Sequence, residues 1–259
     1  MDGAALLSAY DEHLRTEAEV RAAVSGGRLG PLWLARFAGD EGFITYADLV
    51  GVADIDGLVG EALSRFSGDA SIREVEWKSR GHDVAPGLHE ALVAHGFVPQ
   101  EPESIMIGEL HGLVAEAPHP AGLTVRRVTE EGEVRAVSAL QDLVFEGAVS
   151  EANADELMRR LNTDPHMQLW AAEVSGEFVA AGRVELVPGT PFAGLWAGAT
   201  KEEWRGRGIY RALTAARAAA ALERGKALAH SDSTENSRPI LERSGMVKVS
   251  TTTPYIWRR

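Results

Sequence analysis

The residues best suited to chemistry lie between an apolar strand and an Ala-rich helix, in the segment LWAGATKEEWRGRGIYRALTAARAAAALERG. A helix N-terminus carries unpaired N–H groups and a partial positive charge, so arginines at 205, 207 and 211 are locally unfavourable there. A bound anion would reverse that effect, and glycines at 206 and 208 would let the backbone approach it closely. The pattern predicts an anion site that suits a pyrophosphate.

Two other phosphate-binding motifs are excluded by the residues of this loop. The segment has no Gly-Lys-Ser/Thr, so it is not the loop of a nucleotide triphosphatase. GRGIYR also lacks the third glycine of the dinucleotide fingerprint. The remaining structural alternative is a glycine-rich turn from strand to helix with surface arginines.

The loop resembles the acetyl-CoA loop of the GCN5-related N-acetyltransferases (GNAT family), in which Arg/Gln-x-x-Gly-x-Gly/Ala opens a helix. The sequence departs from that pattern at Tyr210, which places a ring near the expected pyrophosphate. The resemblance implies acetyl-CoA as cosubstrate, without a metal, and small-residue strand positions beside the pantetheine arm. The implied acetyl-CoA contacts are Gly198, Ala199, Thr200, Arg205, Gly206, Arg207, Gly208, Ile209, Tyr210, Arg211 and Ser237.

A second motif, SRPILERSGM at 237–246, is similar to the family's later helix and follows the loop by about 30 residues. The family's frequent Asn falls on Thr234, and its frequent tyrosine, a general acid toward the CoA thiolate, falls on Leu241. Alone, the motif is explained by a capped helix with Pro239 in its first turn. Together the two motifs make residues 123–259 resemble a GNAT domain.

The resemblance implies direct acyl transfer to an amine, so a proton acceptor and a proton donor are needed. Glu185, in RVELV, is the carboxylate nearest the strand at 192–200, and partial burial would raise its pKa toward a useful value. The alternative for Glu185 is an outward-facing ion pair with Arg183 on the same strand face. Tyr255 is the predicted proton donor, and Tyr210 offers a second hydroxyl. The alternative for Tyr255 is a purely structural role as an aromatic residue in the core or at the sheet edge. His230 is a further candidate near the expected cleft.

Alternating apolar runs and helical periodicities surround these residues. We expect strands near 32–38, 42–49, 72–79, 103–110, 123–128, 168–174, 177–187, 192–200, 226–231 and 246–257. We expect helices near 2–24, 54–66, 86–95, 131–145, 153–162, 208–223 and 236–244. The order predicts an α/β (α+β) protein, and the resemblance implies the GNAT acyl-CoA N-acyltransferase fold: a mixed, mostly antiparallel sheet flanked by helices, in two tandem copies.

The chain is predicted to divide into a domain at 1–111, a linker at 112–122 and a catalytic GNAT domain at 123–259. Residues 1–115 hold 19 acids and 8 Lys+Arg, whereas 116–259 hold 19 and 18. In the first half, the sequence VGVADIDGL occupies the position that the phosphate loop occupies in the second half. Asp54 and Asp56 would repel a pyrophosphate at the start of the helix expected at 54–66. We therefore interpret residues 1–111 as a degenerate copy without the CoA loop.

Composition limits the classes of partner. The 259 residues are 45% hydrophobic and 25% charged, carry a net charge of −12 and include no cysteine. These values predict a folded protein without disulfides or thiolate metal sites, and neither half is basic enough for general nucleic-acid binding. An acidic N-terminus without a long apolar run favours a cytoplasmic chain with no membrane segment.

We expect an N-acetyltransferase that acts on a primary amine of a small molecule or peptide, as a monomer or homodimer. The alternative is a catalytically silent acyl-CoA-binding or regulatory module, because Tyr210 and Leu241 depart from the family pattern.

Overall fold

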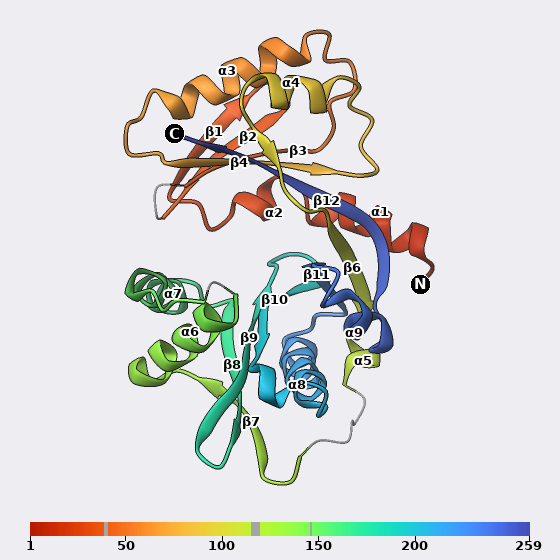
Figure 1. Ribbon diagram of the computed structural model, residues 1–259. Coiled ribbons are helices and arrows are strands. Elements are labelled where there is room, and N and C mark those ends of the chain that lie inside the picture. The colour runs from red at the N-terminus through yellow and green to blue at the C-terminus, as the bar shows by residue number, and fades with distance from the viewer. Residues whose placement is uncertain (39–40, 115–119, 146) are drawn as a thin grey trace. The chain divides into compact units, whose positions relative to one another are not determined.

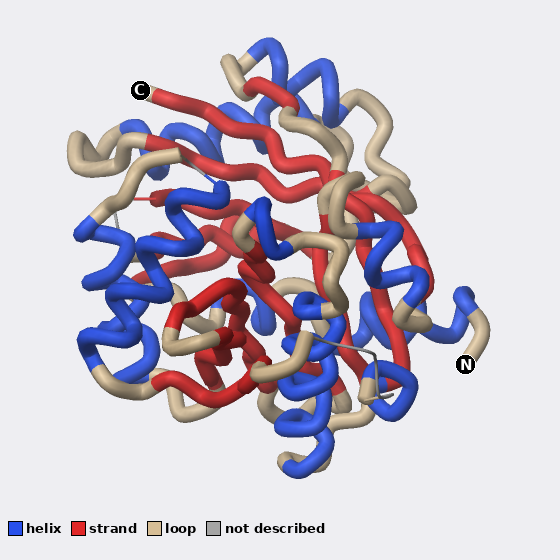
Figure 2. Tube along the Cα trace, turned by 60° about the horizontal axis from the view of Figure 1, so that its bottom comes forward, coloured by secondary structure: helices blue, strands red, loops and turns tan. Residues whose placement is uncertain are grey.

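The computed structural model describes residues 1–38, 41–114, 120–145 and 147–259, which form two compact units (Figure 1). Unit 1 contains Met1–Ile105, Asp232–Arg238 and Lys248–Arg259. Unit 2 contains Met106–Ser231 and Pro239–Val247. Helices lie against strands in both units, as Figure 2 shows by colour, so the predicted mixed α/β class is confirmed.

The sheet of unit 1 contains a three-stranded antiparallel meander, and a fourth strand pairs in parallel with the third. These strands are β1 (Ser25–Leu29), β2 (Leu32–Phe37), β3 (Glu41–Tyr46) and β4 (Glu74–Arg80). The helices are α1 (Gly3–His13), α2 (Glu17–Val20), α3 (Ile55–Ser67) and α4 (Leu88–Ala94). The apolar core contains Ile44, Trp77 and Phe97, which are almost fully buried.

Unit 2 repeats this order. An antiparallel meander is again followed by a helix and by a strand that pairs in parallel with the third meander strand. Its strands are β7 (Leu123–Val128), β8 (Met167–Val174), β9 (Glu177–Leu186), β10 (Phe192–Thr200) and β11 (Leu228–Ser233), whose last two residues group with unit 1. Its helices are α5 (Leu110–Leu113), α6 (Glu131–Phe145), α7 (Glu151–Thr163), the 3-10 turn η1 (Glu202–Trp204), α8 (Ile209–Glu223) and α9 (Arg238–Arg243), although Arg238 itself groups with unit 1.

Two separate sets of helices cover the sheet of unit 2. Side chains of α6 and α7, such as Val137 and Leu157, pack with Ala199 of β10 in one cluster. Ile209 and Leu213 of α8 pack with Ala180 of β9 in another cluster. Figure 1 shows α6 and α7 on one side of β8–β10 and α8 on the other. β10 is therefore held between two helical layers.

The last strand, β12 (Val247–Arg258), belongs to unit 1 for nearly its whole length. It pairs antiparallel with β4 from Thr252↔Arg80 to Arg258↔Glu74, and the short strand β5 (Val98–Pro99) pairs with it as well. This differs from the predicted division at 112–122, which assigned every residue after 122 to one domain. The physical reason is that β12 supplies a backbone ladder to β4 and places Tyr255 in the apolar core of unit 1.

β6 (Glu103–Glu109) carries the chain from unit 1 into unit 2. Met106 on β6 and Leu110 after it pack in the core of unit 2 with Leu241 and Met246. Each unit thus contains a segment from the other half of the sequence. Residues 115–119 of the predicted linker lie outside the described residues.

The predicted helix at 2–24 is wrong in its second half. α1 ends at His13, and Thr16, with a φ of 59°, starts the short helix α2 through a capping box with Glu19. β1 follows directly. The predicted strand at 192–200 and the predicted helix at 131–145 agree with β10 and α6 in both bounds.

Candidate functional site

The predicted phosphate loop connects β10 to α8 in unit 2. Gly206 has a φ of 74° and Gly208 a φ of 81°, a left-handed conformation that favours glycine. Gly208 is the N-cap residue of α8, no side chain caps this helix start, and no acidic residue lies in its first turn. Ile209, which is almost fully buried, fixes the helix to the sheet. The loop therefore presents a helix N-terminus suited to an anion.

The arginines of the loop differ in their contacts. Arg205 donates from Nε to the carbonyl oxygen of Thr200 at 3.1 Å, which ties the loop back to the end of β10. The guanidinium of Arg207 lies over the ring of Trp204, 4.8 Å from its centre, and is exposed. Arg211 is also exposed, in the first turn of α8. Arg207 and Arg211 thus remain accessible to an anion from solvent.

β10 contains a bulge immediately before the loop. Its register with β9 shifts between Trp196 and Ala199, and Ala197 has a φ of 48°. Gln141 of α6 donates to the carbonyl oxygen of Ala197 at 2.7 Å. Arg217 of α8 donates to the carbonyl oxygen of Trp196 at 3.4 Å. Side chains from both helical layers therefore hold the bulge, a role that could not be predicted from the sequence because no local motif marks Gln141 or Arg217.

Arg217 is a buried cation, with about 1% of the residue exposed. It also donates to the carbonyl oxygens of Arg183 and Leu213 and to the hydroxyl of Thr214. Burial lowers the pKa of Arg217, and the neighbouring Tyr210 hydroxyl raises it. The Tyr210 ring lies beside Gly198 of β10 and packs against the core cluster of unit 2.

β10 and β11 pair in parallel only at their beginnings in the observed register. The pairs are Phe192↔Leu228, Ala193↔Ala229 and Gly194↔His230, whereas β10 continues to Thr200. On the other side of β10, Glu185 of β9 pairs with Gly194 and Arg183 of β9 pairs with Trp196. The rings of Trp196 and His230 meet edge to face, with centres 5.1 Å apart.

Glu185 lies on this part of β9 and makes two ion pairs. Its Oε2 is 2.9 Å from Arg160 Nη2 on α7, and its Oε1 is 3.2 Å from Arg183 Nε. About 18% of its side chain is exposed. Both oxygens of the carboxylate therefore already accept a guanidinium N–H, as the alternative interpretation of Glu185 predicted for Arg183.

Two other predicted residues are grouped with unit 1, whereas the loop is grouped with unit 2. Tyr255 and Ser237 belong to unit 1. The Tyr255 hydroxyl is 2.9 Å from His89 Nδ1, and burial raises the pKa of this tyrosine. Leu241 lies in the core of unit 2 and is almost fully buried.

The equivalent helix start in unit 1 is occupied by the chain's own carboxylate. Asp54 is the N-cap of α3 and accepts the N–H of Gly57 at 2.8 Å, and Asp56 lies in the first turn. Here a side chain supplies the negative charge that α8 lacks.

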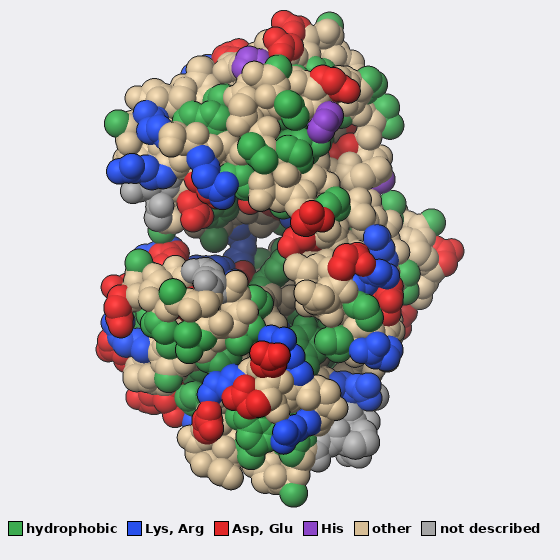
Figure 3. All heavy atoms as spheres, viewed as in Figure 1, with side chains coloured by type: hydrophobic (Ala, Val, Ile, Leu, Met, Phe, Trp, Pro, Cys, Tyr) green, Lys and Arg blue, Asp and Glu red, His purple; other side chains and the backbone are tan. Residues whose placement is uncertain are grey.

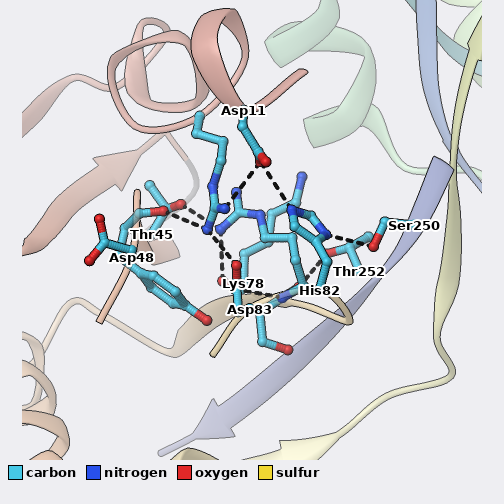
Figure 4. Close-up of polar contacts among 12 residues, drawn as sticks. Asp11, Thr45, Asp48, Lys78, His82, Asp83, Ser250 and Thr252 are labelled. Carbon is cyan, nitrogen blue, oxygen red and sulfur yellow. Dashed lines mark hydrogen bonds and ion pairs between the residues drawn. The ribbon is translucent and has the colours of Figure 1, made fainter. Parts of the chain in front are cut away.

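A buried polar network, defined here by Glu19, Thr45, Lys78, Arg80 and Asp232, lies at the ends of β3 and β4 in unit 1. Figure 4 shows part of it. Thr45 donates to Glu19 at 2.6 Å, Arg80 pairs with Glu19, and Lys78 lies 2.7 Å from Asp232. Although burial alone would raise it, Arg80 and Lys78 lower the pKa of Glu19 to about 2. Charged side chains thus fill the region where β3 and β4 cease to pair.

Comparison with family models matches residues 134–246 to the Acetyltransferase (GNAT) family. This part of the chain is similar to GNAT domains. The match includes the bulge of β10, the phosphate loop, α8 and α9, and it supports an acyltransferase. A search of curated protein sequences finds no match.

Solved structures share the GNAT fold with nearly the whole chain. A GCN5-related N-acetyltransferase from Kribbella flavida has a TM-score of 0.71 at 20% identity, over 98% of this chain and 94% of that chain. A tandem GNAT protein from the clavulanic acid biosynthesis pathway has a TM-score of 0.63 at 15% identity, over 89% and 81%. A GCN5-related N-acetyltransferase from Sphaerobacter thermophilus has a TM-score of 0.63 at 16% identity, over 88% and 76%. The predicted fold is thereby confirmed.

Two further properties concern the described residues as a whole. None of the helices found there has the length and apolar character needed to cross a membrane. The same part of the chain contains no group of three or more His, Asp or Glu side chains placed to hold a metal ion. On the face of unit 2 seen in Figure 3, acidic and basic side chains are interspersed.

Proposed function

We propose that the GNAT domain transfers an acetyl group from acetyl-CoA to a primary amine of a small molecule or peptide, by direct attack of the amine. The observation that carries this proposal is the pair of helix starts. α8 begins at a left-handed glycine without a side-chain cap, whereas α3 is capped by Asp54. An anionic group fits the first and is repelled by the second.

In this proposal the N–H groups after Gly206 and Gly208 hold the pyrophosphate, with Arg207 and Arg211 adding positive charge. Acetyl-CoA would supply a thioester carbonyl, and backbone N–H groups at 198–200 would polarise it. The bulge supports this role at Gly198, because the pairing with β9 is interrupted between Trp196 and Ala199 and resumes at Ala199↔Ala181. Small side chains in the same stretch leave space for a pantetheine arm.

We further propose that Glu185 accepts the proton of the attacking amine. Arg160 and Arg183 fix the orientation of the carboxylate, and an incoming ammonium would compete with them for its oxygens. Tyr255 stays a prediction for the proton donor, and its hydrogen bond to His89 within unit 1 lends that role no support.

The intact 259-residue chain tests the proposal best, because a cut near 115 would remove β12 from unit 1. Release of CoA thiol is measured across a panel of primary amines, and acetyl-CoA binding is measured by calorimetry. We expect one binding site per chain and turnover with at least one amine. Binding without turnover across the panel would favour the silent acyl-CoA-binding module, since Leu241 and Tyr210 depart from the family pattern. Absence of binding would contradict both.

A further inference from the structure

Three side chains of unit 1 form a hydrogen-bonded series that acetyl transfer does not use (Figure 4). His82 Nδ1 lies 2.6 Å from Ser250 Oγ, and His82 Nε2 lies 3.0 Å from Asp11 Oδ1. The imidazole therefore stands between a hydroxyl and a carboxylate, with one ring nitrogen in reach of each. This is the order of nucleophile, base and orienting acid found in serine hydrolases.

The backbone fixes the hydroxyl and the imidazole opposite each other. β12 and β4 pair as Thr252↔Arg80, and Gly81 continues the ladder by donating its N–H to the carbonyl oxygen of Thr251 at 2.9 Å. One further step in this antiparallel register sets His82 beside Ser250. A Cβ on Gly81 would stand 2.3 Å from Thr251 Oγ1, so the glycine permits this close approach.

Asp11 is oriented by a buried arginine. Arg15 Nη1 lies 3.2 Å from Asp11 Oδ1, and Nη2 of the same guanidinium binds Asp83 at 2.9 Å and the carbonyl oxygen of Tyr46 at 3.1 Å. Only about 8% of Arg15 is exposed, so this anchor is fixed. The imidazole remains 20% exposed and Asp11 38% exposed, which leaves the series open to a small molecule from solvent.

We propose that Ser250, His82 and Asp11 form a second catalytic site, which hydrolyses small esters of short carboxylic acids that have a good leaving group. Ser250 Oγ attacks the ester carbonyl carbon while its proton passes to His82 Nδ1. The carbonyl oxygen takes the electron pair and returns it to expel the alkoxide, which takes the proton from His82. Water then repeats these steps on the acyl-serine, releasing the carboxylic acid and restoring Ser250. Asp11 accepts a hydrogen bond from the Nε2–H of His82 throughout, stays ionised and stabilises the imidazolium.

The test uses the full-length chain without CoA and p-nitrophenyl acetate as substrate. We expect hydrolysis above the buffer rate, and a fluorophosphonate probe should label Ser250, located by peptide mass spectrometry. Ser250→Ala and His82→Ala should each lower the protein-dependent rate at least about 10²-fold and abolish labelling. Asp11→Asn should lower the rate while leaving Ser250 available for slower labelling.

Ser79 provides the matched control, because it lies on the neighbouring strand β4 and donates its hydroxyl to the carbonyl oxygen of Thr253 at 3.0 Å. Ser79→Ala should keep both the rate and the labelling, and saturating CoA should change neither. Hydrolysis at the buffer rate, labelling of another residue, or a Ser250→Ala variant as fast as the unmodified chain would each overturn the proposal. If Ser250→Ala does not fold, the position of the label on the unmodified chain still decides.

Discussion

The ring of Tyr210 occupies the space that a side chain on Gly198 would need. A Cβ built on Gly198 would stand 2.7 Å from Tyr210 Cε2 and 2.9 Å from its hydroxyl oxygen. The residue that departs from the family's loop pattern is thus accommodated by a glycine in the bulge of β10. This contact joins the first turn of α8 to the strand expected beside the pantetheine arm.

Gly198→Ala should therefore destabilise the protein by about 1–3 kcal/mol, because the added methyl group overlaps the ring of Tyr210. In a Tyr210→Ala background the same change should cost less than about 0.5 kcal/mol, giving a clear coupling energy. Urea unfolding of the four variants measures this cycle. Tyr210→Phe is the control, since it keeps the ring and should keep the full cost; equal costs in all backgrounds would contradict the contact.

Gly208→Ala should weaken acetyl-CoA binding by about 10–1,000-fold, because a Cβ at the helix start costs one or two charge-assisted hydrogen bonds to the pyrophosphate. Gly225 is a matched control: it follows the other end of α8, has a φ of 78°, and a Cβ there meets nothing within 4 Å. Both substitutions carry similar backbone strain, about 1–2 kcal/mol. Calorimetry should show a loss of affinity for Gly208→Ala alone, and equal losses would refute the loop assignment.

Glu185→Gln should lower turnover by roughly 10²-fold and flatten the acid limb of the pH–rate profile, because the amide keeps the shape and loses the proton acceptor. Glu177→Gln, at the exposed start of the same strand, should leave the rate unchanged. If the pH–rate profile of Glu185→Gln were unaltered, the carboxylate would serve only to form the ion pairs with Arg160 and Arg183.

Local features of the fold could be predicted from the sequence because their causes lie within a few residues. The strand at 192–200 and the helix at 131–145 follow from local sequence patterns, and the strand-to-helix turn at Gly206 and Gly208 follows from residue type. The break after His13 was missed because the apolar spacing continues past it, while Thr16 and Glu19 start a new helix.

Features that depend on distant segments could not be predicted. His82 and Ser250 are 168 residues apart, and no local signal joins them. The bulge carbonyls bind Gln141 and Arg217, which come from two different helices. The same holds for β12, whose Thr-rich sequence predicts a strand but does not reveal that β4 is its partner.

Glu19 should make the stability of unit 1 depend on acid pH. Its folded pKa, about 2, lies below its ordinary value of 4.5, so its contribution is complete above pH 4.5 and is lost as the pH falls toward 2. The shift corresponds to about 3 kcal/mol. Glu19→Gln should remove this contribution and leave the buried Arg80 without its carboxylate, which costs about 3–5 kcal/mol at neutral pH.

The measurement is the free energy of unfolding in urea between pH 2 and pH 7. The unmodified chain should lose stability steeply below pH 4.5, and Glu19→Gln should be less stable at pH 7 with a flatter profile. Glu17→Gln, an exposed position on the same helix, should follow the unmodified curve. Glu19 forms ion pairs with both Arg80 and Lys78. If the free energy of unfolding of Glu19→Gln followed the same pH dependence as that of the unmodified chain, these ion pairs would not be the source of the acid sensitivity.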